Sequence, residues 1–236
     1  MNSFMNKQIS YGLFALLLCC NAGATTFSYS VNAIIPDGDL NGYQNSQPLS
    51  GLPPVSTDVN VTLNLSSGFN GDFYAYLSHN NAIAILLNRV GRSSASSVGY
   101  PDAGFGLDSL ATSFTLDDQA GHDVHLYRSF PFALNSSGQL TGQWQPDGRA
   151  IDPLSAGSVF DGAARSSTMG VFNGMDPNGL WTLYLADVSP GGEGTLVGWG
   201  LQITAVPEPA SLTLLGCAVL AVLLWSPPRQ RADGAR

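Results

Sequence analysis

Apolar and polar residues alternate with a period of two in three segments of the chain. In the range 59–65 every odd position is Val or Leu and every even position is Asn or Thr, and 181–186 and 197–203 also alternate. This period places one face of a strand in the core and the other in water. The range 82–87 is a short, wholly apolar run, typical of a strand buried on both faces. No helical period appears between residues 25 and 204, so the pattern predicts an all-β fold, an antiparallel β-sandwich of the jelly-roll type.

The last two alternating segments are separated by a glycine-rich loop, Ser189–Gly194. A loop of this composition reverses the chain, which predicts a hairpin between 179–187 and 194–203. In such a hairpin Trp181 and Trp199 lie near each other, and each buries a large apolar area in the core.

The range 205–236 has the organisation of a sorting or anchoring signal. Sixteen uncharged residues, 210–225, span about 24 Å as a helix, close to the membrane core of about 30 Å, and flanking positive charge stays in the cytoplasm. The motif before this stretch and the basic tail after it contain Val206, Pro207, Glu208, Pro209, Arg229 and Arg231. This order resembles the PEP-CTERM signal, which an exosortase-type membrane protease reads in Gram-negative bacteria. An ordinary C-terminal membrane anchor is the alternative.

The first 24 residues have the pattern of a secretory signal peptide. Lys7 precedes the apolar run 11–20, and Ala22 and Ala24 form a small-x-small cleavage site. The sequence therefore predicts three parts: a signal peptide at 1–24, an exported domain at 25–204, and the sorting signal with one transmembrane helix at 205–236. The chain is expected to be exported through the inner membrane, anchored there transiently, and then released to the cell surface or medium.

The composition of residues 25–204 limits the possible partners. This range has five arginines, no lysine and fifteen acidic residues, hence a net charge of −10. Nucleic acid is excluded as a partner, because binding it requires cations that neutralise phosphates. The range also contains no cysteine, so an exported domain without disulfides must be held together by packing, with or without metal ions.

Several short motifs recur through this range in a fixed order. They are Ile35–Asp37, Phe69–Phe73, Phe114–Ala120, Gly142–Pro146, Phe160–Gly162, Asn178–Asp187 and Gly194–Leu201. In this order and spacing they resemble the P domain, or Homo B domain, that follows the catalytic domain of proprotein convertases and many bacterial subtilisin-like proteases. The resemblance covers residues 33–204 and implies a β-sandwich that accompanies proteolysis without performing it.

Four acidic residues in these matching turns are candidate calcium ligands: Asp72, Asp117, Asp118 and Asp187. Carboxylates joined by backbone carbonyls are the oxygen ligands that calcium prefers. The P-domain resemblance also implies calcium, which occurs in some bacterial members. The alternative is that these side chains cap turns through hydrogen bonds.

The remaining candidate groups do not predict an enzyme. His122 and His125 would face opposite sides of a predicted strand and are expected at the surface, while His79 is expected in a turn without a partner. The run 166–170 resembles a subtilisin serine motif, but it has Thr168 at the nucleophile position. It is therefore interpreted as a loop.

Three functions stay open for this non-enzymatic domain. The first is a binding or structural protein of the bacterial cell surface or extracellular matrix, whose partner is a surface protein or polysaccharide. The second is an accessory domain that stabilises or targets a separate subtilisin-like serine protease. The third is a carbohydrate-binding module, for which the candidate aromatic residues are Tyr43, Tyr74, Tyr76, Tyr100 and Trp144.

We expect the mature protein to begin at Thr25 and to lack Arg236, because the basic tail remains only until the sorting protease acts. Intact-mass analysis of the surface-released protein measures both ends. A released product that retains Arg236 would contradict sorting and leave the anchor alternative.

Overall fold

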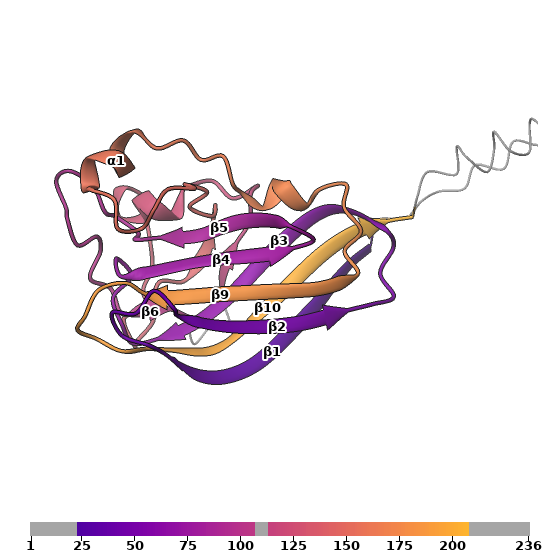
Figure 1. Ribbon diagram of the computed structural model, residues 1–236, viewed down its shortest axis with the longest axis horizontal. Helices are drawn as coiled ribbons and strands as arrows, with labels where there is room; N and C mark the ends of the chain where they lie inside the picture. The colour runs from indigo at the N-terminus through magenta and orange to yellow at the C-terminus, as the bar shows by residue number, and fades with distance from the viewer. Residues whose placement is uncertain (1–22, 107–112, 208–236) are drawn as a thin grey trace, which may run out of the picture. The chain divides into compact units, whose positions relative to one another are not determined.

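The computed structural model describes residues 23–106 and 113–207, which form ten β-strands, one short α-helix and two 3₁₀-helices (Figure 1). The strands are β1 (Gly23–Ile35), β2 (Tyr43–Leu49), β3 (Val55–Ser66), β4 (Phe73–His79), β5 (Ala82–Asn88), β6 (Gly104–Phe105), β7 (Phe114–Leu116), β8 (Gly142–Trp144), β9 (Gly179–Asp187) and β10 (Gly194–Val206). The helices are α1 (Gly157–Gly162), η1 (Val124–Ser129) and η2 (Met169–Phe172).

The strands form two sheets. One sheet has the order β1-β10-β3-β7-β8, with β6 paired to β3, and the other has the order β2-β9-β4-β5. All of these pairs are antiparallel except β7 and β8, which are parallel. The prediction of a mostly β fold with antiparallel sheets is therefore confirmed, with one parallel pair added.

Side chains from both sheets meet in one apolar core, as the alternating patterns predicted. Val61 and Leu63 of β3, Leu77 of β4 and Leu183 of β9 are at most 2% exposed. The neighbours between them in the chain turn outward, because successive side chains of a strand point to opposite faces. The run 82–87 belongs to β5, whose residues from Ala84 onward are buried.

The predicted hairpin between the last two strands is wrong. β9 pairs with β2 and β4, whereas β10 pairs with β1 and β3, so the two strands lie in different sheets. The loop between them crosses from one sheet to the other. Trp181 therefore lies opposite His79 of β4, and Trp199 lies opposite Tyr29 of β1. Both tryptophans are core residues, as expected, at 0% and 3% exposure.

The histidine predictions are corrected by the local structure. The segment after Gly121 is not a strand, because Asp123 accepts a hydrogen bond from the His125 N–H and begins the 3₁₀-helix η1. His125 is buried rather than at the surface. Its Nδ1 lies 2.6 Å from Asp147 Oδ2, and its Nε2 lies 2.9 Å from the Arg92 carbonyl oxygen. Burial lowers the pKa of His125, but its bond to Asp147 more than offsets this, and the pKa is raised.

His79 is also buried and has partners. Its ring stacks on the Trp181 indole with centroids 4.1 Å apart, and its two nitrogens contact the carbonyl oxygens of Leu180 and Asp176. His79 thus holds the start of β9 against the end of β4. The expectation that His79 is a turn residue without a partner was wrong.

Both predicted processing signals fall largely outside the described residues. Gly23 and Ala24 begin β1, and Val206 ends β10 before Pro207. Ala22, Glu208, Pro209, Arg229 and Arg231 lie outside. Within 23–106 and 113–207 no helix is long and apolar enough to span a membrane, and the predicted span at 210–225 is not among these residues.

Candidate functional site

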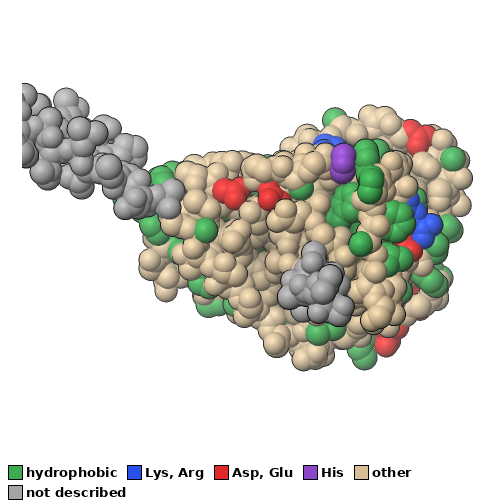
Figure 2. Space-filling model, turned by 180° about the vertical axis from the view of Figure 1, so that it is seen from behind, with side chains coloured by type: hydrophobic (Ala, Val, Ile, Leu, Met, Phe, Trp, Pro, Cys, Tyr) green, Lys and Arg blue, Asp and Glu red, His purple; other side chains and the backbone are tan. Residues whose placement is uncertain are grey.

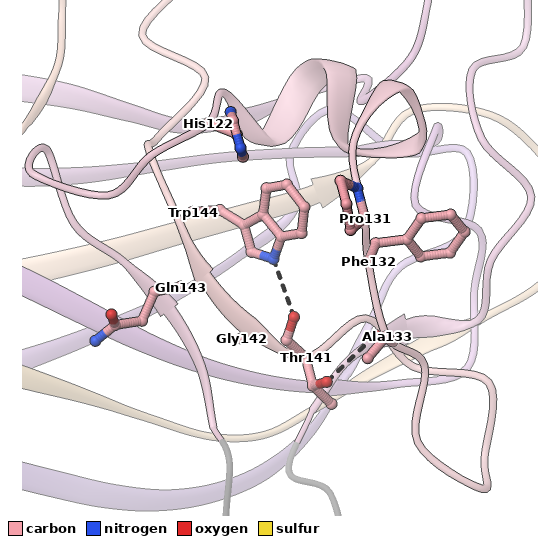
Figure 3. Close-up of a pocket in the computed structure, with 8 residues that line it drawn as sticks. All are labelled: His122, Pro131, Phe132, Ala133, Thr141, Gly142, Gln143 and Trp144. Carbon is pink, nitrogen blue, oxygen red and sulfur yellow. Dashed lines mark hydrogen bonds between the residues drawn. The ribbon is translucent and has the colours of Figure 1, made fainter.

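A cleft of about 490 Å³ opens beside β8, at one edge of the larger sheet. Its lining residues are His122, Pro131, Phe132, Ala133, Thr141, Gly142, Gln143 and Trp144 (Figure 3). Figure 2 shows a face on which hydrophobic side chains gather next to a histidine. No lining residue carries a carboxylate, an ammonium or a guanidinium group, so the cleft favours an uncharged ligand.

One residue of β8 offers a free backbone edge to this cleft. The Gly142 N–H donates to Ser113, and the Trp144 carbonyl oxygen accepts from Asp117, so both residues bond on the β7 side. In a parallel pair, alternate residues of a strand direct their backbone groups to opposite sides. Gln143, which lies between these two, therefore directs its N–H and C=O away from β7. On that side the N–H groups of Thr141 and Gln145 bond the carbonyl oxygens of residues 133 and 122. Among the described residues, nothing bonds the Gln143 backbone groups between them.

Aromatic side chains fix the walls of the cleft. The Trp144 indole points into the space between β8 and the segment 131–133, and its Nε1–H donates to the Thr141 carbonyl oxygen at 2.9 Å (Figure 3). The exposed His122 ring stacks on Phe130 with centroids 3.8 Å apart. Phe132 points away from the indole and packs edge-on against Tyr127. These contacts hold the walls apart while leaving the strand edge open.

The local sequence explains why the chain leaves this opening. Asn135 Oδ1 accepts hydrogen bonds from the N–H groups of Ser137 and Gln139, which closes a tight turn before β8. Gly142 has a φ of +92°, a conformation that favours glycine. The turn brings the segment 131–133 alongside the chain only as far as Thr141, so the pairing ends two residues before Gln143.

The structure gathers only part of the aromatic set proposed for sugar binding. Tyr74 and Tyr76 lie together with Tyr184, and the Tyr76 and Tyr184 rings stack at 4.6 Å. Tyr100 instead packs against Tyr127, and Tyr43 lies on the edge strand β2. Trp144 is only 4% exposed. Most of these rings therefore contact other rings, which leaves little free aromatic surface for a sugar.

A second feature is an acidic corner formed by Asp37, Asp72 and Asp187 around Arg89. Asp72 directly precedes β4 and Asp187 ends β9, and Phe73 pairs with Asp187. Arg89 donates to Asp72 Oδ1 at 3.3 Å and to Ser189 Oγ at 2.7 Å. Asp37 was not singled out from the sequence, and its carboxylate accepts the Gly191 N–H at 3.0 Å.

Asp187 carries the unusual charge of this corner. It is 1% exposed, its Oδ1 accepts the Ser189 N–H at 3.3 Å, and its Oδ2 has no partner among the described residues. Burial raises the pKa of Asp187 to about 6, and the Asp72 and Asp37 carboxylates add to this rise. The ionised side chain is therefore costly in the folded state at neutral pH.

Asp117 and Asp118 lie elsewhere and cap backbone. Asp117 Oδ1 accepts the Gln119 N–H at 2.7 Å. Asp118 accepts from the Thr168 hydroxyl and from the N–H groups of Met169 and Gly170 at the start of η2. Thr168, the position compared with a serine nucleophile, thus donates to a carboxylate, and the interpretation of 166–170 as a loop agrees with this geometry.

The four predicted calcium ligands therefore divide into two pairs. In the part of the chain that the structure describes, no three acidic, histidine or cysteine side chains are placed to hold one metal ion. All four carboxylates are bound to Arg89 or to backbone N–H groups, and a calcium ion needs six to eight oxygen ligands. These residues do not form a calcium site by themselves, and calcium binding stays a prediction.

Comparison with known proteins adds remote structural likeness. No family model and no curated protein matches the sequence. A crystal structure of the Aeromonas sobria serine protease with the chaperone ORF2 has 13% identity and a TM-score of 0.43, covering 80% of this chain and 28% of that chain. A structure of the serine protease of Aeromonas sobria has 14% identity and a TM-score of 0.37, covering 78% and 27%. The chain thus spans about a quarter of the length of these proteins.

We expect Asp187→Asn to stabilise the protein above pH 6. A pKa raised in the folded state gives stability that is present below the unfolded pKa, near 4, and is lost as pH rises through about 6. Removing the charge should recover about 3 kcal/mol at pH 7.5 and nothing at pH 4. Thermal melts at both pH values measure this difference.

The control is Glu193→Gln, which removes one exposed charge from the neighbouring loop and should leave Tm unchanged.

The same melts in chelator and in millimolar calcium test whether the domain binds calcium. A calcium-dependent rise of several degrees that Asp187→Asn abolishes would establish a metal site and reverse the sign expected for this variant.

Proposed function

We propose that this chain is a non-catalytic binding protein whose described domain recognises an extended polypeptide segment at the β8 cleft. The observation that carries the proposal is the free N–H and C=O pair of Gln143. These two groups complement the C=O and N–H of one residue in an extended peptide, as in recognition by strand addition. The uncharged lining selects an uncharged segment.

A polypeptide fits the cleft better than a sugar does. Sugar binding relies on exposed ring faces and hydrogen-bonding side chains, but the Trp144 indole is nearly buried and its N–H is bonded within the protein. The Gln143 side chain points away from the cleft (Figure 3). Apart from the His122 imidazole, the polar groups of the cleft that remain free are those of the backbone, and backbone groups pair best with backbone groups.

We further propose that the partner is a separate subtilisin-like serine protease, which the domain stabilises or targets. The P-domain motifs described above, from Ile35–Asp37 to Gly194–Leu201, support this role by resemblance. In this proposal the chain is exported by its signal peptide and held by its C-terminal segment until an exosortase-type protease releases it to the cell surface.

We expect Ala133→Trp to weaken peptide binding at the cleft, because a large side chain at this exposed lining position fills the space. Peptides displayed on phage are selected on the immobilised full chain, and the affinities of the selected peptides are then measured by titration. Wild type should enrich peptides with uncharged, strand-forming centres, and Ala133→Trp should weaken them at least tenfold.

Ser136→Trp is the matched control, since it adds the same side chain at an exposed position of the preceding turn, outside the cleft lining. Equal binding by both variants, or enrichment of polysaccharide rather than peptide in a parallel glycan array, would contradict the proposal. A second experiment adds each form of the domain to a subtilisin-like protease whose catalytic serine is blocked, and measures the Tm of the protease. A rise in this Tm with wild type and with Ser136→Trp, but not with Ala133→Trp, would support the accessory role.

A further inference from the structure

We propose that β1 is a homodimer interface, at which two copies of this chain pair their β1 strands antiparallel about a two-fold axis through Ser28. β1 and β8 are opposite edges of the same sheet. The interface is therefore separate from the β8 cleft and does not depend on the function proposed for it.

The outer edge of β1 has unpaired backbone groups. The carbonyl oxygens of Phe27 and Tyr29 point at β10. A Cβ added to Gly200 would lie 2.7 Å from the Phe27 oxygen, and a Cβ added to Gly198 would lie 2.7 Å from the Tyr29 oxygen. In an antiparallel ladder, alternate residues point their backbone groups to opposite sides. Thr26, Ser28 and Ser30 therefore turn their N–H and C=O groups to the open edge, where no strand of the described residues pairs with them.

The part of this edge that precedes Val31 lacks the features that usually prevent strand pairing. β1 contains no charged residue and no proline in thirteen residues, whereas exposed edges are commonly blocked by lysine, proline or a bulge. A bulge with Asn32 at φ 55° interrupts the strand after Ser30. It leaves residues 25–30 regular, about 20 Å of open edge in the expected mature protein.

The side chains on the inner face of β1 are also incompletely covered. Phe27, Tyr29 and Val31 pack against the core but are only partly buried. A second strand beside β1 would cover these side chains and extend the sheet. The exposed edge thus offers both hydrogen bonds and apolar area to a partner.

The sequence of the strand is complementary to itself about Ser28. Antiparallel pairing on this axis places Phe27 opposite Tyr29 and Thr26 opposite Ser30, all within the regular part of the strand. Aromatic meets aromatic and hydroxyl meets hydroxyl, which are favourable cross-strand pairs. Ser28 faces the open edge, so the two Ser28 residues form a hydrogen-bonded pair, and the contact is isologous. Because the strand is uncharged, a second copy meets no like charge here despite the net charge of the domain.

The dimer would have a consequence for binding. The two β8 clefts lie at the far ends of one continuous sheet, so both stay open in the dimer. A dimer then holds two ligand sites, and a partner that is itself multivalent would be bound with avidity.

Charge placed on the edge tests this pairing. Two tagged forms of the full chain are co-expressed, recovered through one tag, and scored for the other. Thr26→Lys with Ser30→Lys puts lysine opposite lysine twice across the axis, and Thr26→Glu with Ser30→Glu does the same with glutamate. Both positions are exposed, so the substitutions do not disturb the core.

Wild type should co-precipitate with itself, and each double variant should lose self-recovery at least tenfold. Co-expression of the lysine variant with the glutamate variant should restore recovery, because every pair is then of opposite charge. A wild type that does not co-precipitate, equal self-recovery by the variants, or no restoration in the mixed pair would overturn the interface. Restoration also shows that both variants are folded.

Discussion

Every backbone N–H and C=O group of a β-sheet needs a partner. The edges of the two sheets differ in whether other segments of this chain supply those partners. At β5 the segment after β8 covers the edge: Asp147 and Gly148 donate to the carbonyls of Leu86 and Ile85, and the Ile85 N–H bonds Ser167. At β2 the edge contains Pro48, which has no N–H to offer. At β8 the N–H groups of Thr141 and Gln145 are bonded, but the backbone groups of Gln143 between them have no partner among the described residues. At β1 no described strand pairs with the outer edge. The two proposed binding surfaces are the two edges of the larger sheet.

The core sets where these edges lie. It contains no cysteine, so packing between the sheets must hold them in register. The crossing from β9 to β10 is central to this packing, because consecutive strands enter different sheets and each has neighbours on both sides. Trp181 and Trp199 are buried on these two strands. Of the two proposed binding edges, β1 lies next to β10, and β8 is separated from β10 by β3 and β7.

The strands with strong alternation could be predicted from the sequence, but their partners could not. The pattern in 59–65 or 197–203 says which face is buried, and a strand in either sheet satisfies it equally. The predicted hairpin failed for this reason, since a glycine-rich loop permits a reversal within one sheet or a crossing between two. The buried His125 was missed because its partner Asp147 is 22 residues away in sequence.

The candidate site was less predictable than the fold. Trp144 was singled out by residue type, but the property that matters at β8 is the free backbone of Gln143, which depends on the parallel pairing with β7 and has no sequence signature. The acidic residues show the same limit. Asp72 and Asp187 meet because β4 and β9 pair, whereas Asp118 caps η2. Residue type gave the groups, and only the topology decided which of them lie together.

Amide hydrogen exchange at β8 tests the central claim, an open strand edge at Gln143, most directly. In the free protein, the account predicts slow exchange of the Thr141 and Gln145 amides, which bond neighbouring carbonyls, and fast exchange of the Gln143 amide between them. A cleft-binding peptide should slow exchange at Gln143 alone of the three. A Gln143 amide that is as protected as its neighbours in the free protein would mean that the edge is closed, and would contradict the account.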